Sequence, residues 1–238
     1  MPDLSEDVDI EPDLTDDVAL VTGATRGIGA EIAAALADLG ATVYAGARTL
    51  SDVTAPDQQP LRLDVTDDTA IESAIDTIRR EQGQLTILVN NAGVFPETGP
   101  LHDIDLDAFD DTLDVNLRGP VTVTKHALPL LLKEDGSRVV TLSSGLGQFT
   151  EGQMDGQYPA YRLSKVGVGG LTAYLDAEYG DEGLVANAVS PGWVRTDMGG
   201  EDAPRTPTKG AETPVWLARF RPASPAGYLW KDKKIIRW

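Results

Sequence analysis

Tyr161 and Lys165, in the segment YRLSK, form a pair suited to acid–base chemistry. A separation of four places both side chains on one face of a helix. A free phenol has a pKa of about 10, so it is a poor acid or base at neutral pH. Because an ammonium group favours the phenolate, we expect Lys165 to lower the pKa of Tyr161 toward the working range.

A candidate hydroxyl precedes this pair in the chain. Ser143 and Ser144 follow the apolar run RVVTL at 138–142, which is typical of a buried strand. Ligands of open α/β sheets bind outside the carboxyl ends of the strands, so a serine at this place would face the substrate. The alternative is a structural hydroxyl that caps the end of the strand.

A glycine-rich loop, TGATRGIG at 22–29, lies between an apolar run and an amphipathic stretch. Its glycines permit a tight turn, close approach of a pyrophosphate, and close packing of helix on strand. The N–H groups that open the following helix would bind that phosphate. A tight turn without a ligand is the alternative. The loop residues that we expect to contact a dinucleotide are Gly23, Thr25, Arg26, Gly27, Ile28 and Gly29.

The residue types after the second expected strand address cofactor choice. An acid there would bind the ribose of NAD, but the chain has Ala47-Arg48 in TVYAGAR, and Arg26 lies in the glycine loop. Two guanidinium groups suit a 2′-phosphate, so NADP(H) is the expected cofactor and NAD(H) the second choice. Two solvated surface arginines are the alternative.

Strands that alternate with helices must position these residues. This order predicts an α/β fold, a single-domain Rossmann-type doubly wound parallel sheet with helices on both faces. The acidic composition of residues 1–17 predicts a flexible tail. Residues 18–238 are expected to form the domain. We expect Pro214 to kink or shorten its helix. The expected strands are 18–22, 42–45, 61–63, 86–90, 138–142, 184–189 and a last pair within 228–238; the expected helices are 28–39, 67–82, 105–116, 119–133, 159–179 and 207–220.

Composition excludes several classes of protein. The chain has 238 residues, no cysteine, and only His102 and His126 as histidines, so we expect neither a disulfide scaffold nor a metal site. A net charge of −18 disfavours nucleic-acid binding. The acidic, lysine-poor composition suggests a salt-adapted protein, or simply an acidic one. We also expect no membrane contact and a cytoplasmic location, because no long apolar run and no basic leader is present.

The motifs occur in an order that resembles the short-chain dehydrogenase/reductase family over about residues 17–238. They are TGxxxGxG at 22–29, NNAG at 90–93, Ser144 and the YxxxK pair. The chain is most similar to the short, carbonyl-reductase-like members. The resemblance implies hydride transfer with a nicotinamide cofactor.

The same resemblance assigns roles to individual residues. Tyr161 would donate the proton, Ser144 would hold the substrate oxygen, Lys165 would bind the nicotinamide ribose, and Asn116 would anchor a proton-relay water. Asp64 would contact the adenine, although a turn aspartate is the alternative. The other implied cofactor contacts are Val65, Asn91, Ala92, Gly93, Pro191, Gly192, Val194 and Thr196.

Substrate contacts are harder to read from the sequence. Phe149, Met154, Tyr158 and Trp193 are candidates beside Ser144, and ordinary loop packing is the alternative. The expected function is NADPH-dependent reduction of a ketone or aldehyde, or the reverse oxidation. A 3-oxoacyl reductase, a sugar or polyol dehydrogenase, and an NADP-binding sensor or scaffold stay open. The expected partner is a small carbonyl or alcohol substrate, and a homo-oligomer (dimer or tetramer) and a monomer both stay open.

Overall fold

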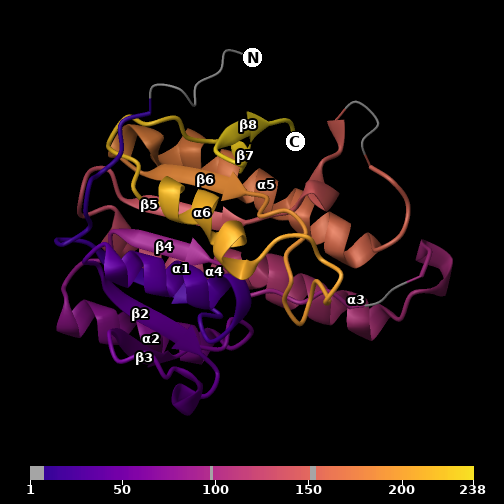
Figure 1. Cartoon of the computed structure of the whole chain (residues 1–238), viewed down its shortest axis with the longest axis horizontal. Helices are drawn as coiled ribbons and strands as arrows, with labels where there is room; N and C mark the ends of the chain where they lie inside the picture. Colours follow the sequence, from indigo (N-terminus) through magenta and orange to yellow (C-terminus); the bar gives the residue numbers. More distant parts are fainter. Residues whose placement is uncertain (1–7, 97–98, 151–153) are drawn as a thin grey trace.

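The computed structural model describes residues 8–96, 99–150 and 154–238. Within them, an eight-stranded sheet forms the centre of the molecule, in the order β3-β2-β1-β4-β5-β6-β7-β8 (Figure 1). The strands are β1 Val18–Thr22, β2 Thr42–Ala47, β3 Gln58–Arg62, β4 Ile87–Asn90, β5 Arg138–Leu142, β6 Val185–Val189, β7 Leu229–Lys231 and β8 Lys234–Ile236. Neighbouring strands are parallel from β3 to β7, and β8 is antiparallel to β7. The predicted doubly wound fold is therefore confirmed.

Helices cover both faces of the sheet (Figure 1). They are α1 Gly27–Asp38, α2 Asp68–Glu81, α3 Leu106–Leu113, α4 Gly119–Leu131, α5 Pro159–Tyr179 and α6 Pro207–Leu217. Side chains of α1 and α6 share one buried apolar cluster, whereas α2, α4 and α5 share another on the opposite face. The chain reverses direction across the sheet between β1 and β4, and ligands of such folds bind at the carboxyl ends of the strands there.

Among the element boundaries that differ from the sequence prediction, three bear on its reasoning. Strand β3 begins at Gln58 and includes Pro60, which is tolerated because β3 is an edge strand. Helix α6 ends at Leu217 rather than near 220, in keeping with Pro214 inside it. The helices expected at 105–116 and 119–133 are joined by a π-helical turn, Asp114–Arg118, which leaves no break between them.

Residues 8–17 pack on the domain, which differs from the flexible tail expected for 1–17. Leu14 is buried, and its N–H donates to the carbonyl of Leu39. Asp17 forms an ion pair of 2.7 Å with the buried guanidinium of Arg138 on β5. Leu14 and Asp17 anchor this segment through these contacts. The acidic composition of residues 1–17 as a whole did not indicate that two of its residues are anchored. Residues 1–7 lie outside the described part of the chain.

Candidate active site

The glycine loop has no room for larger side chains. Gly23 and Gly27 have φ of +64° and +56°, the left-handed region that glycine adopts without strain. A Cβ atom at Gly29 would lie 2.3 Å from the Gly23 carbonyl oxygen. In the described structure no side chain caps the start of α1, and its first turn carries no acid. This helix start therefore fits the phosphate of a dinucleotide.

The segment after β4 is tied to the same loop. The Asn91 amide donates to the carbonyls of Thr22 and Gly23 at 2.9 and 3.1 Å. The Thr22 hydroxyl accepts from the backbone N–H groups of Asn91 and Ala92, both at 3.0 Å. These bonds place Asn91 and Ala92 beside the glycine loop, and the contact of the NNAG motif with a cofactor stays a prediction.

The loop after β6 forms the facing side. A Cβ at Gly27 would lie 3.0 Å from Cγ2 of Thr196, so this threonine covers the glycine loop. Gly192 has a φ of +82°, and the Arg205 side chain packs directly against it. Arg205 also makes a two-pronged ion pair with Asp232, at 2.6 and 2.7 Å. Residues 191–196 are thus anchored to the β7–β8 hairpin at the edge of the site.

The two arginines expected to select the cofactor are both exposed. Arg26 forms an ion pair of 3.2 Å with Asp197, a residue that the sequence reasoning missed. Arg48 lies close enough to Asp64 to help lower the pKa of that carboxyl group, although the backbone N–H of Thr66 is the largest cause. Asp64 also accepts from the Thr66 hydroxyl at 2.8 Å, so it caps a turn, and its contact with adenine stays a prediction.

Tyr161, Ser144 and Lys165 converge at the carboxyl end of β5. Burial raises the pKa of Tyr161 to about 12, and a hydrogen bond with the Ser144 side chain acts more weakly in the opposite direction. This upward shift is the reverse of the one expected from Lys165 alone, because loss of solvent outweighs any attraction between the charges. Tyr161 therefore carries its proton at neutral pH.

Lys165 is buried beneath the tyrosine ring. Its Nζ lies 5.5 Å from the ring centroid and donates to the Leu142 carbonyl at 2.7 Å. Burial lowers the pKa of Lys165 to about 8. The ammonium form still predominates at neutral pH, and two of its three N–H donors remain for other partners.

Asn116 occupies the π-helical turn between α3 and α4, a feature often found at functional sites. Its amide exchanges two hydrogen bonds of 2.8 Å with the backbone of Val94. It also donates to the Ser164 hydroxyl at 3.3 Å, within the YxxxK segment. Asn116 therefore fixes the loop after β4 to the catalytic helix, and its proton-relay role stays a prediction.

Two apolar residues near the candidate site, Phe95 and Met198, were not predicted from the sequence. Phe95 packs edge-on against Tyr161 and tilted against Tyr158, with ring centroids 4.5 and 4.9 Å apart. Among the residues predicted to line the substrate site, Phe149, Met154 and Trp193 are exposed. Met198 is also exposed, and its Cε lies 4.0 Å from where a Cβ of Gly93 would be. The only clue to Phe95 in the sequence was its position just after the NNAG motif.

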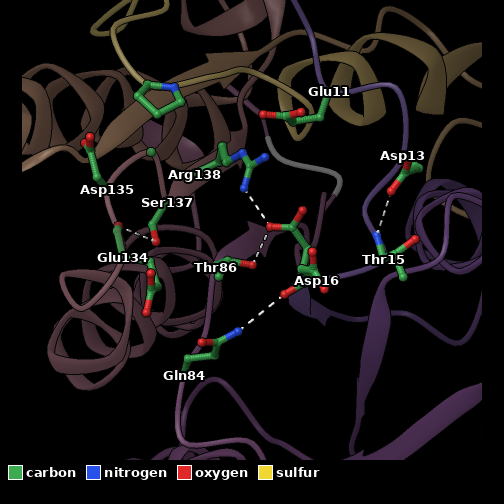
Figure 2. A pocket seen from close by; sticks show the side chains of 13 residues that line it. Glu11, Asp13, Thr15, Asp16, Gln84, Thr86, Glu134, Asp135, Ser137 and Arg138 are labelled. Atoms are coloured by element: carbon green, nitrogen blue, oxygen red, sulfur yellow. Dashed lines mark hydrogen bonds and ion pairs between the residues drawn. The ribbon is translucent and has the colours of Figure 1, made fainter.

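A cavity of about 510 Å³ lies at the opposite end of the sheet (Figure 2). Glu11, Asp13, Asp16, Glu134 and Asp135 are among the residues that line it. Figure 2 shows Arg138 and Thr86 pointing into it, where both bond to Asp17. Among the described residues, no group of carboxylates or histidines could hold a metal ion. The residues that bond to Asp17 thus lie in the wall of this cavity.

The fold and these residues define the class of protein as a dinucleotide-binding α/β oxidoreductase. Residues 17–206 match the short chain dehydrogenase family. The chain belongs to the short-chain dehydrogenase/reductase family, whose members act on CH–OH and C=O groups. In the described residues, no helix is long and apolar enough to cross a membrane.

Relatives of known sequence or structure share most of the chain. It is 36% identical over 187 residues to the 3-oxoacyl-[acyl-carrier-protein] reductase FabG of Escherichia coli, covering 76% of this chain and 75% of that protein. A short chain dehydrogenase of Burkholderia cenocepacia in complex with NADP is 30% identical, with a TM-score of 0.80 over 92% and 96% of the two chains. The carbonyl reductase Sniffer of D. melanogaster is 25% identical, with a TM-score of 0.83 over 94% and 100%.

Proposed function

We propose that this protein is an NADPH-dependent reductase of ketones or aldehydes, which also catalyses the reverse oxidation. The observation that carries the proposal is the buried side chain of Tyr161, which is hydrogen-bonded to Ser144 and has the Lys165 ammonium 5.5 Å from its ring centroid. A carbonyl reductase needs a proton donor that keeps its proton at neutral pH and faces the substrate oxygen.

Three side chains of the site have separate roles in the proposed reduction of the carbonyl group. A nicotinamide cofactor, when bound, would supply the hydride that adds to the carbonyl carbon. Tyr161 and Ser144 donate hydrogen bonds to the substrate oxygen and stabilise its developing negative charge. Tyr161 then transfers its proton to that oxygen, which completes the alcohol, and the Lys165 ammonium stabilises the phenolate left behind until a proton from solvent replaces the one lost.

Support for NADP(H) comes from the charges around the glycine loop. Arg26 lies at the start of α1, and the end of β2 has Ala47-Arg48, where an acid would have repelled a 2′-phosphate. The relative from Burkholderia cenocepacia, whose structure contains NADP, adds support. The other residues that we propose to line the cofactor are Gly23, Thr25, Gly27, Ile28, Gly29, Asp64, Val65, Asn91, Ala92, Gly93, Pro191, Gly192, Val194 and Thr196.

A second candidate is reduction of a 3-oxoacyl chain. The 36% identity to FabG favours it. Both candidate reactions share one mechanism. They differ in the group attached to the carbonyl that the substrate site must bind. The exposed Phe149, Trp193 and Met198 favour an apolar substituent over a polyhydroxylated sugar.

A homo-oligomer is a further proposal. Val121 on α4 and Leu163 and Tyr174 on α5 are apolar or aromatic side chains left exposed in the single chain. Burial of such residues against a second copy would stabilise a dimer. Sedimentation measurements on the purified protein test this: a monomer at all concentrations would contradict it.

The function is tested by following consumption of reduced nicotinamide with NADPH and with NADH. Substrates should include apolar aldehydes, ketones, 3-oxoacyl thioesters and sugars. We expect turnover with NADPH on apolar carbonyls. Turnover only on 3-oxoacyl thioesters would favour the second candidate, and binding of cofactor without turnover on any substrate would contradict both.

A further inference from the structure

The end of the described chain contacts the segment that follows Ser144. The Gln148 amide donates to the Arg237 carbonyl at 2.8 Å, and the backbone N–H of Thr150 donates to the Trp238 carbonyl at 2.9 Å. The Thr150 hydroxyl donates to the same oxygen. Residues 237–238 therefore hold the 145–150 segment by its backbone and two side chains.

Trp238 is itself seated on the catalytic helix α5. A Cβ atom at Gly169 would lie 2.6 Å from Cζ3 of the indole, so glycine makes room for the ring. Gly169 stands one helical turn beyond Lys165. At the next residue, Gly170, a Cβ would meet nothing within 4 Å. The indole thus occupies one specific place on α5.

The inner side of the 145–150 segment rests on the same helix. A Cβ at Gly147 would lie 2.8 Å from Cβ of Lys165. The buried guanidinium of Arg162 donates to the Leu146 carbonyl at 3.3 Å and to the Gln157 carbonyl at 3.0 Å. The segment is therefore held between α5 and residues 237–238.

Phe149 lies between the two residues that bond to residues 237–238. Its side chain is 51% exposed, so its own packing does little to fix its position. Its neighbours Gln148 and Thr150 are both tied by hydrogen bonds. The position of Phe149 relative to Ser144 thus depends on residues 237–238.

We propose that residues 237–238 are a positioning element that sets how the 145–150 segment receives the substrate. The proposal rests on the reductase function above, because it assigns Phe149 to the substrate side. In this proposal, residues 237–238 act through the 145–150 segment and not at the reacting atoms. Losing their anchor should raise KM for bulky carbonyls more than for small ones, with kcat less affected.

The test compares three variants of the full chain. Trp238→Ala removes the indole, Gly169→Ala displaces it, and Gly170→Ala is the matched control on the same helix. Hydrogen exchange of residues 144–150 is measured first, because it needs no substrate. KM and kcat for a small and a bulky apolar aldehyde follow, together with the Kd for NADPH.

We expect faster exchange at Thr150 and a KM for the bulky aldehyde about tenfold higher in Trp238→Ala, roughly the effect of losing one net hydrogen bond. Gly169→Ala should behave in the same way, whereas Gly170→Ala and the Kd for NADPH should not change. In Phe149→Ala, adding Trp238→Ala should no longer alter the preference between the two aldehydes.

Two results would overturn the proposal. One is unchanged exchange in both Trp238→Ala and Gly169→Ala. The other is faster exchange with the same loss for both aldehydes, which would indicate a purely structural role. An inactive wild-type protein would instead contradict the proposed function, so the two failures are distinguishable.

Discussion

The ring of Phe95 stands edge-on against the ring of Tyr161, with centroids 4.5 Å apart and an angle of 81° between the planes. Phe95 follows β4 and Tyr161 lies on α5, so two distant parts of the chain meet at the ring of Tyr161. This contact shields the phenol from water on one side. It contributes to the burial that keeps Tyr161 protonated.

The pH dependence should follow from the two buried groups. Burial raises the pKa of Tyr161 to about 12 and lowers that of Lys165 to about 8. Tyr161 therefore keeps its proton across the neutral range, whereas Lys165 loses its charge as the pH rises through 8. We expect kcat/KM for NADPH, which reports on the free enzyme, to be level below pH 8 and to fall above it. A rise through pH 8 in the reduction direction would contradict this assignment.

Replacing Phe95 should expose the phenol. Phe95→Ala would admit water beside Tyr161, lower its pKa toward the ordinary value and remove the ring contact. We expect a loss of about tenfold in kcat, since an aromatic pair contributes about 1 kcal/mol beyond its buried area. Phe95→Leu keeps an apolar side chain and should retain more activity. Equal loss in both variants would show that exclusion of water is not the reason.

Cofactor selection should depend on Arg26 and its partner. Arg26→Ala should weaken NADPH binding at least about tenfold and leave NADH nearly unchanged, because the guanidinium binds the extra phosphate. Arg26 and Asp197 are both about three-quarters exposed, so Asp197→Asn should strengthen NADPH binding only about twofold to threefold.

Titration calorimetry would measure both cofactor affinities. Arg80→Ala, which removes the same charge from an exposed site on α2, is the control. If Arg26→Ala weakened NADPH and NADH to the same extent, Arg26 would not be reading the 2′-phosphate.

The anchor of residues 8–17 should contribute to stability and not to catalysis. Asp17→Ala leaves the buried guanidinium of Arg138 without its carboxylate, which costs about 3 to 5 kcal/mol. Asp16→Ala removes an exposed neighbouring acid and should cost less than about 0.5 kcal/mol. Urea unfolding measures both, and kcat should stay unchanged because the pair lies away from the candidate active site. Equal stability of the two variants would contradict the account.

The fold and the tight backbone of the glycine loop could be predicted from the sequence because both depend on local patterns. Short apolar runs mark the buried strands, and Gly23, Gly27 and Gly29 are required by backbone geometry that few other residues tolerate. Motif order then placed Ser144, Tyr161 and Lys165 together. The strands and the glycine loop can be recognised from a few neighbouring residues, whereas the link between Ser144 and Tyr161 depends on the order of motifs along the chain.

Other features depend on contacts between segments far apart in the chain. The ion pair of Asp17 with Arg138 joins the residue before β1 to β5. The acidic composition of residues 1–17 predicted a flexible tail and gave no sign of this pair. The pKa of Tyr161 is set by burial, which residue spacing alone does not reveal. Phe95 has no motif, and its importance appears only once α5 packs beside the loop after β4.

The central claim is that Tyr161 donates the proton. The direct measurement compares NADPH consumption by the wild-type protein and Tyr161→Phe on the best carbonyl substrate, with the Kd for NADPH measured alongside. We predict a fall in kcat of at least about 100-fold with the Kd nearly unchanged, because the ring remains and only the acidic hydroxyl is lost. A variant that retains most of its turnover would contradict the account.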